Sequence, residues 1–83
     1  MKVSIRYFAS VREALGRGGE TIETSARDLA ALRDELVARG GAYAWSLARG
    51  TAVRVALDQV MSEESAVLGE GCEVAFFPPV TGG

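Results

Sequence analysis

The chain has 83 residues, which fits one domain and leaves little volume for an enclosed active site, because a chain near this size buries only about 60% of its unfolded surface. Hydrophobic residues make up 48% and charged residues 24% of the sequence, a balance that argues against a disordered chain. The formal net charge is −2 and the charges are scattered, so the sequence offers no basic stripe for binding nucleic acid.

The sequence lacks the features of several classes of protein. No segment approaches the roughly 20 apolar residues of a membrane span, and the N-terminus lacks the features of a signal peptide. We therefore expect a soluble, cytoplasmic protein with no membrane partner. The chain has no histidine and one cysteine, Cys72, which excludes an internal disulfide, a histidine-based triad and a structural zinc site within the chain.

The first segment, KVSIRYF (residues 2–8), alternates in the manner of a strand. Phe8 falls on one face, and the opposite face, which we expect to be buried, carries Val3, Ile5 and Tyr7. The segment SVREALG (residues 10–16) predicts a short helix, because Ser10 and Glu13 have capping-box spacing and a glycine follows. After the glycine turn GRGG, the segment ETIETS predicts a second strand that pairs with the first.

The main helix is predicted over ARDLAALRDELVAR (residues 26–39). Its apolar residues recur at three- and four-residue spacing and form one stripe, made of Leu29, Leu32, Leu36 and Val37. We expect Ser25 to cap the N–H of Asp28 while Asp28 reaches back, and Gly40 and Gly41 to end the helix. The following AYAWSLA predicts a short helical or irregular connection, anchored on the core by Trp45 and Leu47.

Two further strands are predicted in the second half of the chain. TAVRVAL (residues 51–57) alternates and should bury Val53, Val55 and Leu57. Asp58 and Gln59 predict a turn into a short strand around Val60 and Met61. EVAFF (residues 73–77) places Val74 and Phe76 on one face and Ala75 and Phe77 on the other, and two prolines then end the strand.

This order of elements predicts an α+β fold. One amphipathic helix that covers one face of a four- or five-stranded mixed sheet buries all the apolar stripes, which is a ubiquitin-like β-grasp arrangement. We expect residues 1–77 to form the domain and residues 78–83 to form an extended, flexible C-terminal tail.

The tail has the sequence PPVTGG. Pro78 and Pro79 favour a stiff exit from the sheet, and six residues can reach on the order of 20 Å. Gly82 and Gly83 lack Cβ atoms, so this backbone can thread a narrow channel in a partner and present the carboxylate of Gly83. We expect Val80 and Thr81 to position that end, although a Gly-Gly end is also compatible with an ordinary frayed terminus.

The segments FASVRE, LRDEL, VALDQ and above all GCEVAFFPPVTGG resemble the small sulfur-carrier subunit of molybdopterin synthase, the MoaD family. The resemblance spans nearly the whole chain. It implies that Gly83 matches the terminal glycine whose carboxylate a ubiquitin-activating-like enzyme adenylates with ATP. A sulfur donor protein then converts the carboxylate to a thiocarboxylate, which is a 1-thioglycine. Asp58 departs from the asparagine common in the family, and Cys72 departs from the usual acidic residue.

The resemblance also implies partners. The tail inserts into the large synthase subunit, where sulfur passes to cyclic pyranopterin monophosphate during molybdenum cofactor biosynthesis, in an assembly of two small and two large subunits. The small subunit is then a carrier and not an enzyme on its own, with no metal and no permanently bound cofactor. Because first and last strands of a β-grasp sheet are neighbours, we expect Phe8 and Phe77 to be exposed together, with Met61 joining them as a docking patch. The alternative is that loops of the chain cover them.

Three other functions stay open. A sulfur carrier for thiamine thiazole synthesis shares the fold and the diglycine but generally lacks the FFPPVTGG ending. A protein modifier would form isopeptide bonds through Gly83, and Lys2 is the only lysine on which such a protein could build chains of itself. A plain structural domain is the fourth reading. Cys72 could be proposed as a sulfur donor, but its place beside an apolar strand favours a structural role.

Overall fold

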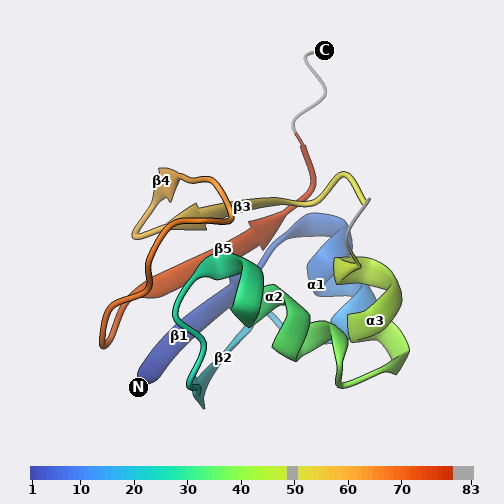
Figure 1. Ribbon diagram of the computed structural model, residues 1–83. Coiled ribbons are helices and arrows are strands. Elements are labelled where there is room, and N and C mark those ends of the chain that lie inside the picture. Colours follow the sequence, from blue (N-terminus) through green and yellow to red (C-terminus); the bar gives the residue numbers. More distant parts are fainter. Residues whose placement is uncertain (49–50, 80–83) are drawn as a thin grey trace.

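The computed structural model describes residues 1–48 and 51–79, and they form a five-stranded mixed sheet with helices packed on one face (Figure 1). In chain order the elements are β1 (Lys2–Tyr7), α1 (Ala9–Leu15), β2 (Gly19–Glu23), α2 (Leu29–Val37), α3 (Gly41–Leu47), β3 (Arg54–Leu57), β4 (Val60–Met61) and β5 (Glu73–Phe77). The strand order is β2-β1-β5-β3-β4. This confirms the predicted α+β, ubiquitin-like β-grasp arrangement.

The first and last strands lie side by side at the centre of the sheet. β1 and β5 are parallel, with Tyr7 opposite Phe76, while β1–β2, β3–β5 and β3–β4 are antiparallel pairs. The short helix α1 connects β1 to β2 and ends at Gly16, whose φ of 74° suits glycine and whose N–H donates to the carbonyl of Arg12. The chain therefore leaves β5 beside the end of β1.

The core lies between the sheet and the helices, where the sequence pattern placed it. The alternating residues of β1 and β5 that face the helices are almost fully buried, namely Val3, Ile5, Tyr7, Val74 and Phe76. From α2 the same core receives Leu29, Leu32 and Leu36. Val55 is buried, and the predicted Val53 and Leu57 are only partly buried against it. Cys72 is a buried free thiol, as a packing role requires.

Both predicted N-caps are wrong. α1 begins at Ala9, Phe8 is its N-cap without a side-chain hydrogen bond, and Ser10 lies inside the helix. α2 begins at Leu29 instead of near Ser25, and Asp28 is the N-cap, accepting a hydrogen bond from the N–H of Ala31 at 2.8 Å. The backbone before Leu29 forms hydrogen bonds with distant segments and therefore does not start a helix at Ser25. The N–H of Thr24 donates to the Met1 carbonyl, and Asp28 forms a β-bridge with Val67.

The segment after α2 also differs from expectation. α2 ends at Val37, with Ala38 as its C-cap, while Gly40 is the N-cap of α3 and Gly41 its first residue. Leu47 anchors α3 in the core as predicted, but Trp45 is 64% exposed and anchors nothing there. A seven-residue helix on the outside of a small core turns only one side inward, and Trp45 falls on the other side.

One buried charge ties the helices together. Arg33 is 4% exposed; its guanidinium donates to the carbonyls of Leu47 at 2.6 Å and Ala48 at 2.9 Å, and to Thr51 Oγ1 at 2.9 Å. These bonds satisfy carbonyls at the C-terminal end of α3 that have no partner within the helix. None of the helices in residues 1–48 and 51–79 has the length and hydrophobicity to cross a bilayer.

Candidate functional site

The open face of the sheet carries an apolar surface next to the end of β5. Strand register places Ala75 opposite Arg6 on one side and Ala56 on the other, and Met61 lies opposite Ala56. These residues therefore form one row across β1, β5, β3 and β4, on the face away from the helices. Phe77, two residues beyond Ala75, continues this face toward the end of the strand.

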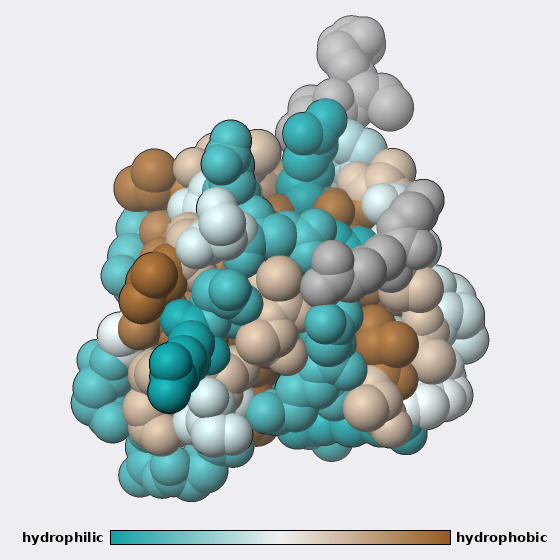
Figure 2. All heavy atoms as spheres, in the orientation of Figure 1, coloured by the Kyte–Doolittle hydropathy of each residue, from teal (hydrophilic) through white to brown (hydrophobic). Residues whose placement is uncertain are grey.

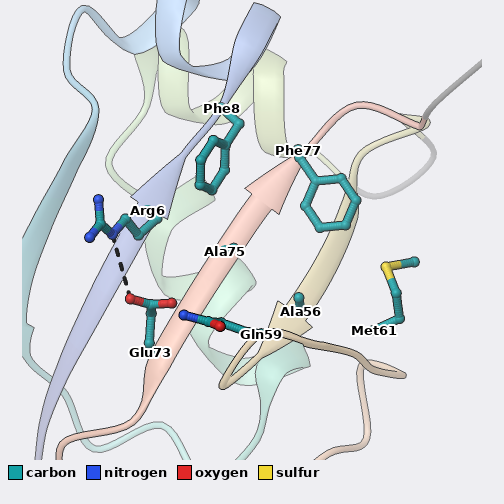
Figure 3. Close-up of a pocket in the computed structure, with 8 residues that line it drawn as sticks. All are labelled: Arg6, Phe8, Ala56, Gln59, Met61, Glu73, Ala75 and Phe77. Atoms are coloured by element: carbon teal, nitrogen blue, oxygen red, sulfur yellow. Dashed lines mark ion pairs between the residues drawn. The ribbon is translucent and has the colours of Figure 1, made fainter.

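We call this surface the outer patch and define it by the five apolar residues Phe8, Ala56, Met61, Ala75 and Phe77. Together with Arg6, Gln59 and Glu73 they line a shallow groove, which Figure 3 shows in close-up. The two alanines leave a low floor between the larger side chains. Phe8 is 47% exposed and Met61 60% exposed. The structure brings the three expected residues, Phe8, Met61 and Phe77, together around one groove. Phe8 and Met61 are exposed, whereas Phe77 is only partly exposed.

The short strand β4 extends the hydrophobic surface around the edge of the sheet. Val60 is 65% exposed and adjoins Met61. In the orientation of Figure 1, Figure 2 shows hydrophobic residues at the corner of the molecule where β4 lies, and further hydrophobic residues among hydrophilic ones elsewhere on this face. Contiguous exposed apolar surface of this kind marks interaction sites more often than single exposed residues do.

The rim of the outer patch is polar. Arg6 Nε lies 3.5 Å from Glu73 Oε1, and both side chains remain partly exposed (Figure 3). An exposed ion pair of this kind contributes about 0–1 kcal/mol to stability, so these charges can change partner at little cost. An apolar centre with a charged rim is the usual anatomy of a protein interface.

A tight turn fixes one side of the patch. Asp58 and Gln59 have positive φ values of 49° and 68°, as in the type I′ turns that join antiparallel strands. Asp58 also accepts a hydrogen bond from the N–H of Glu73 at 2.9 Å, and its own N–H donates to the Glu73 carbonyl at 2.8 Å. The sequence predicted the turn, and aspartate, like asparagine, tolerates this backbone conformation. The turn places Gln59 on the rim and leads into Met61.

On the helix side of the sheet, a partly buried carboxylate of β2 holds the end of β1. Glu20 accepts hydrogen bonds from the hydroxyls of Tyr7 and Tyr43, each at 2.8 Å, and from Arg39 at 2.9 Å. Burial disfavours its charge, but hydrogen bonds from Arg39, Tyr43 and Tyr7 outweigh burial and lower the pKa of Glu20. Burial and the bond to Glu20 raise the pKa of Tyr7, which therefore stays a neutral donor. No sequence motif signalled this cluster, since its members come from four separate segments.

The same cluster supports the residues that project outward. The rings of Tyr7 and Phe76 stack with centroids 6.2 Å apart on the inner face. Phe8 and Phe77 follow these two residues in the chain and point to the other face (Figure 3). A fixed inner pair thus holds the backbone from which two patch residues extend.

Pro78 and Pro79 follow β5 directly and are the last residues that the structure describes. The predicted positioning residues Val80 and Thr81, and the predicted reactive end Gly82 and Gly83, lie outside the described residues. Across residues 1–48 and 51–79, no three His, Cys, Asp or Glu side chains form a group that could hold a metal ion.

The comparisons with known proteins agree with this arrangement. The sequence model of the ThiS family matches residues 5–83. The chain belongs to the ThiS family. The molybdopterin synthase sulfur carrier subunit of Haemophilus influenzae is 33% identical to this ThiS-family chain over 81 residues, 98% of this chain and 99% of that protein. Two further curated relatives carry the same name.

Solved structures extend the likeness of this ThiS-family chain to three dimensions. One chain in the complex of subunits 1 and 2 of the Helicobacter pylori molybdopterin-converting factor is 27% identical, with a TM-score of 0.69 and coverage of 100% of both chains. SAMP1 from Haloferax volcanii is 21% identical with a TM-score of 0.78, also over 100% of both chains, and shows the shared fold. The resemblance inferred from the sequence motifs is confirmed.

Proposed function

We propose that this chain is the sulfur-carrier subunit of a molybdopterin synthase. The observation that carries the proposal is the position of the outer patch at the base of the tail. Phe8 and Phe77 flank the point where the chain leaves β5, so a partner that binds the patch lies where it can receive residues 78–83. The proposal is supported by the curated relatives, which carry that name and match over nearly their full length.

The chemistry of the proposal takes place at Gly83. Its carboxylate attacks the α-phosphorus of ATP on a ubiquitin-activating-like adenylyltransferase, so that pyrophosphate leaves and an acyl-adenylate forms. A sulfur donor protein then supplies sulfur to the acyl carbon, AMP leaves, and the product is a thiocarboxylate. This chain contributes the reactive end and its positioning, while the activating and acceptor sites belong to partners.

The proposed acceptor is cyclic pyranopterin monophosphate in the large synthase subunit. There the sulfur passes to the pterin and water supplies the oxygen that restores the carboxylate. The chain therefore acts as a carrier and co-substrate and needs no permanently bound cofactor. The proposed assembly contains two small and two large subunits. We place it in the cytoplasm, where ATP is available to the activating enzyme.

In this proposal Gly82 and Gly83 keep the end of the tail slim enough to enter the partner, and residues 78–81 set its reach. Phe8, Met61 and Phe77 bind the large subunit and the activating enzyme in turn. Because both partners need the same patch and the same tail, they should exclude one another.

Intact mass tests the proposal. The chain is incubated with its cognate activating enzyme, ATP and sulfur donor, beside a variant that lacks Gly83. We expect a mass gain equal to the exchange of one oxygen for sulfur in the full chain and none in the truncated one. Higher-mass conjugates on target lysines, without that gain, would instead establish a protein modifier. A thiocarboxylate that the large subunit leaves intact but a thiazole-forming system consumes would establish the thiamine pathway.

A further inference from the structure

Two exposed arginines stand on either side of the outer patch without a carboxylate partner. Arg12 lies on α1, one helical turn after Phe8, and Arg54 begins β3 directly opposite Phe77. Among residues 1–48 and 51–79, no Asp or Glu forms an ion pair with either side chain. We call these two residues the flanking arginines. A guanidinium presents its N–H donors as a fork that matches a carboxylate, so each of them can bind one acidic group.

Arg12 borders the patch on the side of β1. Together with Arg6 and Phe8 it lines a groove on the outer face of this strand, and Arg6 and Phe8 also line the groove of the outer patch. The guanidinium of Arg12 lies against a glycine, since a Cβ built on Gly18 would be 3.4 Å from Arg12 Nε. Because Gly18 has no side chain, the guanidinium has room to lie beside the patch.

Arg54 borders the patch on the side of β3. Since Arg54 and Ala56 are two residues apart on this strand, both face the outer side of the sheet. Arg54 also lines a second groove at the edge of the sheet, and Met61 lines both this groove and the outer patch. β5 lies between β1 and β3, so the two strands next to the flanking arginines are about 10 Å apart.

The lack of partners distinguishes the flanking arginines from most others in the described part of the chain. Four arginines lie 2.9–3.5 Å from a glutamate oxygen, namely Arg6, Arg17, Arg33 and Arg39. Glu13 and Glu63 line grooves beside the flanking arginines, but within residues 1–48 and 51–79 no ion pair joins them. A single exposed arginine is ordinarily solvated, whereas two on either side of an apolar centre form a pattern that a partner can match.

We propose that the flanking arginines make the outer patch selective for an acidic protein surface, one that presents an apolar centre with carboxylates on both sides. The inference rests on the proposed function, in which the large synthase subunit is that partner. Charges at the rim of an interface raise the association rate with a partner of opposite charge and disfavour partners of like charge. The formal net charge of the chain is −2, so local cations are needed to attract an acidic partner.

The experiment measures the association rate of the full chain with the large synthase subunit by biolayer interferometry. Binding is compared at ionic strengths of about 0.1 M and about 1 M, where the Debye length is about 10 Å and about 3 Å. The flanking double variant combines Arg12→Gln with Arg54→Gln. We expect it to associate at least about 5-fold more slowly than wild type at the lower ionic strength, and within about 2-fold of wild type at the higher one.

Two matched variants are measured beside it. The distal double variant combines Lys2→Gln with Arg27→Gln and removes the same charge from two exposed residues at the other end of the sheet, where Lys2 pairs with Glu23 at the end of β2. Its rate should stay within about 2-fold of wild type at both ionic strengths. Arg12→Lys with Arg54→Lys keeps both charges and should retain about half or more of the wild-type rate. Circular dichroism confirms that the variants keep the fold.

Equal association rates for the flanking and the distal double variants at the lower ionic strength would overturn the proposal. A flanking double variant that associates faster than wild type would also overturn it, because that result indicates a basic partner surface. A wild-type chain that does not bind the large subunit at either ionic strength would contradict the proposed function itself. Normal binding that is insensitive to the flanking arginines would contradict only this inference, so the two failures are distinguishable.

Discussion

Met61 is the patch residue best suited to a binding test, because it is 60% exposed on the two-residue strand β4 and supports little of the core. Met61→Asp should weaken binding of the large synthase subunit by about 10-fold or more, since a charge would be buried against an apolar partner surface. The dissociation constant is measured by isothermal titration calorimetry.

The control for that variant is Val67→Asp, because Val67 is 75% exposed and lies outside the outer patch. Both variants should change the free energy of unfolding by no more than about 0.5 kcal/mol, as exposed positions usually do. Equal binding by Met61→Asp and wild type would contradict the assignment of the patch as a docking surface.

Glu20 is the residue from which a pH dependence follows. Its folded-state pKa is lowered, so the ionised form stabilises the fold at neutral pH. That contribution is present above the unfolded pKa of about 4.3 and is lost as the pH falls through the lower folded value. Glu20→Gln should therefore cost about 1–3 kcal/mol at pH 7 and progressively less below pH of about 4. Urea unfolding of both proteins across this range measures the difference, and a gap that stays constant would contradict the argument.

At the level of elements, the pairing of β1 with β2 requires a glycine. A Cβ built on Gly19 would lie 2.6 Å from the carbonyl oxygen of Ile5. Gly19→Ala should therefore lower the free energy of unfolding by about 1–3 kcal/mol, because the two strands must separate locally. The control is Gly69→Ala, where a Cβ would meet nothing within 4 Å. Chemical denaturation measures the free energy of unfolding of both variants. An equal loss in the two would contradict the steric explanation.

The elements themselves were largely predictable, because period-2 and period-3.6 patterns are set by which face is buried. β1 and β5 were read correctly from Val3, Ile5, Tyr7, Val74 and Phe76. The helix starts were not predictable from local capping motifs. Ser25 satisfies a capping pattern, but the chain there is held by pairing with the N-terminal strand, and Asp28 caps instead. A capping motif does not predict the start of a helix where the same backbone groups form hydrogen bonds with distant parts of the chain.

Some residues of the candidate site were also predictable from the sequence, and others were not. Phe8, Met61 and Phe77 could be placed on one face from strand alternation and the expected neighbourhood of β1 and β5. The contacts of Glu20 and Arg33 could not, because each joins side chains and carbonyls from segments that meet only in the folded chain. Buried polar clusters have no sequence period, so only the three-dimensional arrangement reveals them.

For the whole molecule, we expect the folded domain and its last residues to have separate tasks. In the proposed function, the patch determines which partner is bound and the tail carries the reactive group. Gly82→Val should therefore leave unfolding and large-subunit binding through the patch nearly unchanged. It should lower the single-turnover rate of sulfur transfer by about 10-fold or more, since a side chain beside the reactive end displaces it from its productive position. A loss of stability with no loss of transfer would contradict this division.

The proposed function requires that Gly83 carries the sulfur that the large subunit incorporates. The most direct measurement starts from the full chain bearing a ³⁵S-labelled thiocarboxylate at Gly83, mixed with the large synthase subunit and cyclic pyranopterin monophosphate. We expect the label to move into molybdopterin while the mass of the chain returns to that of the carboxylate form. Label that stays on the chain, or that is released as free sulfide without entering the pterin, would contradict it.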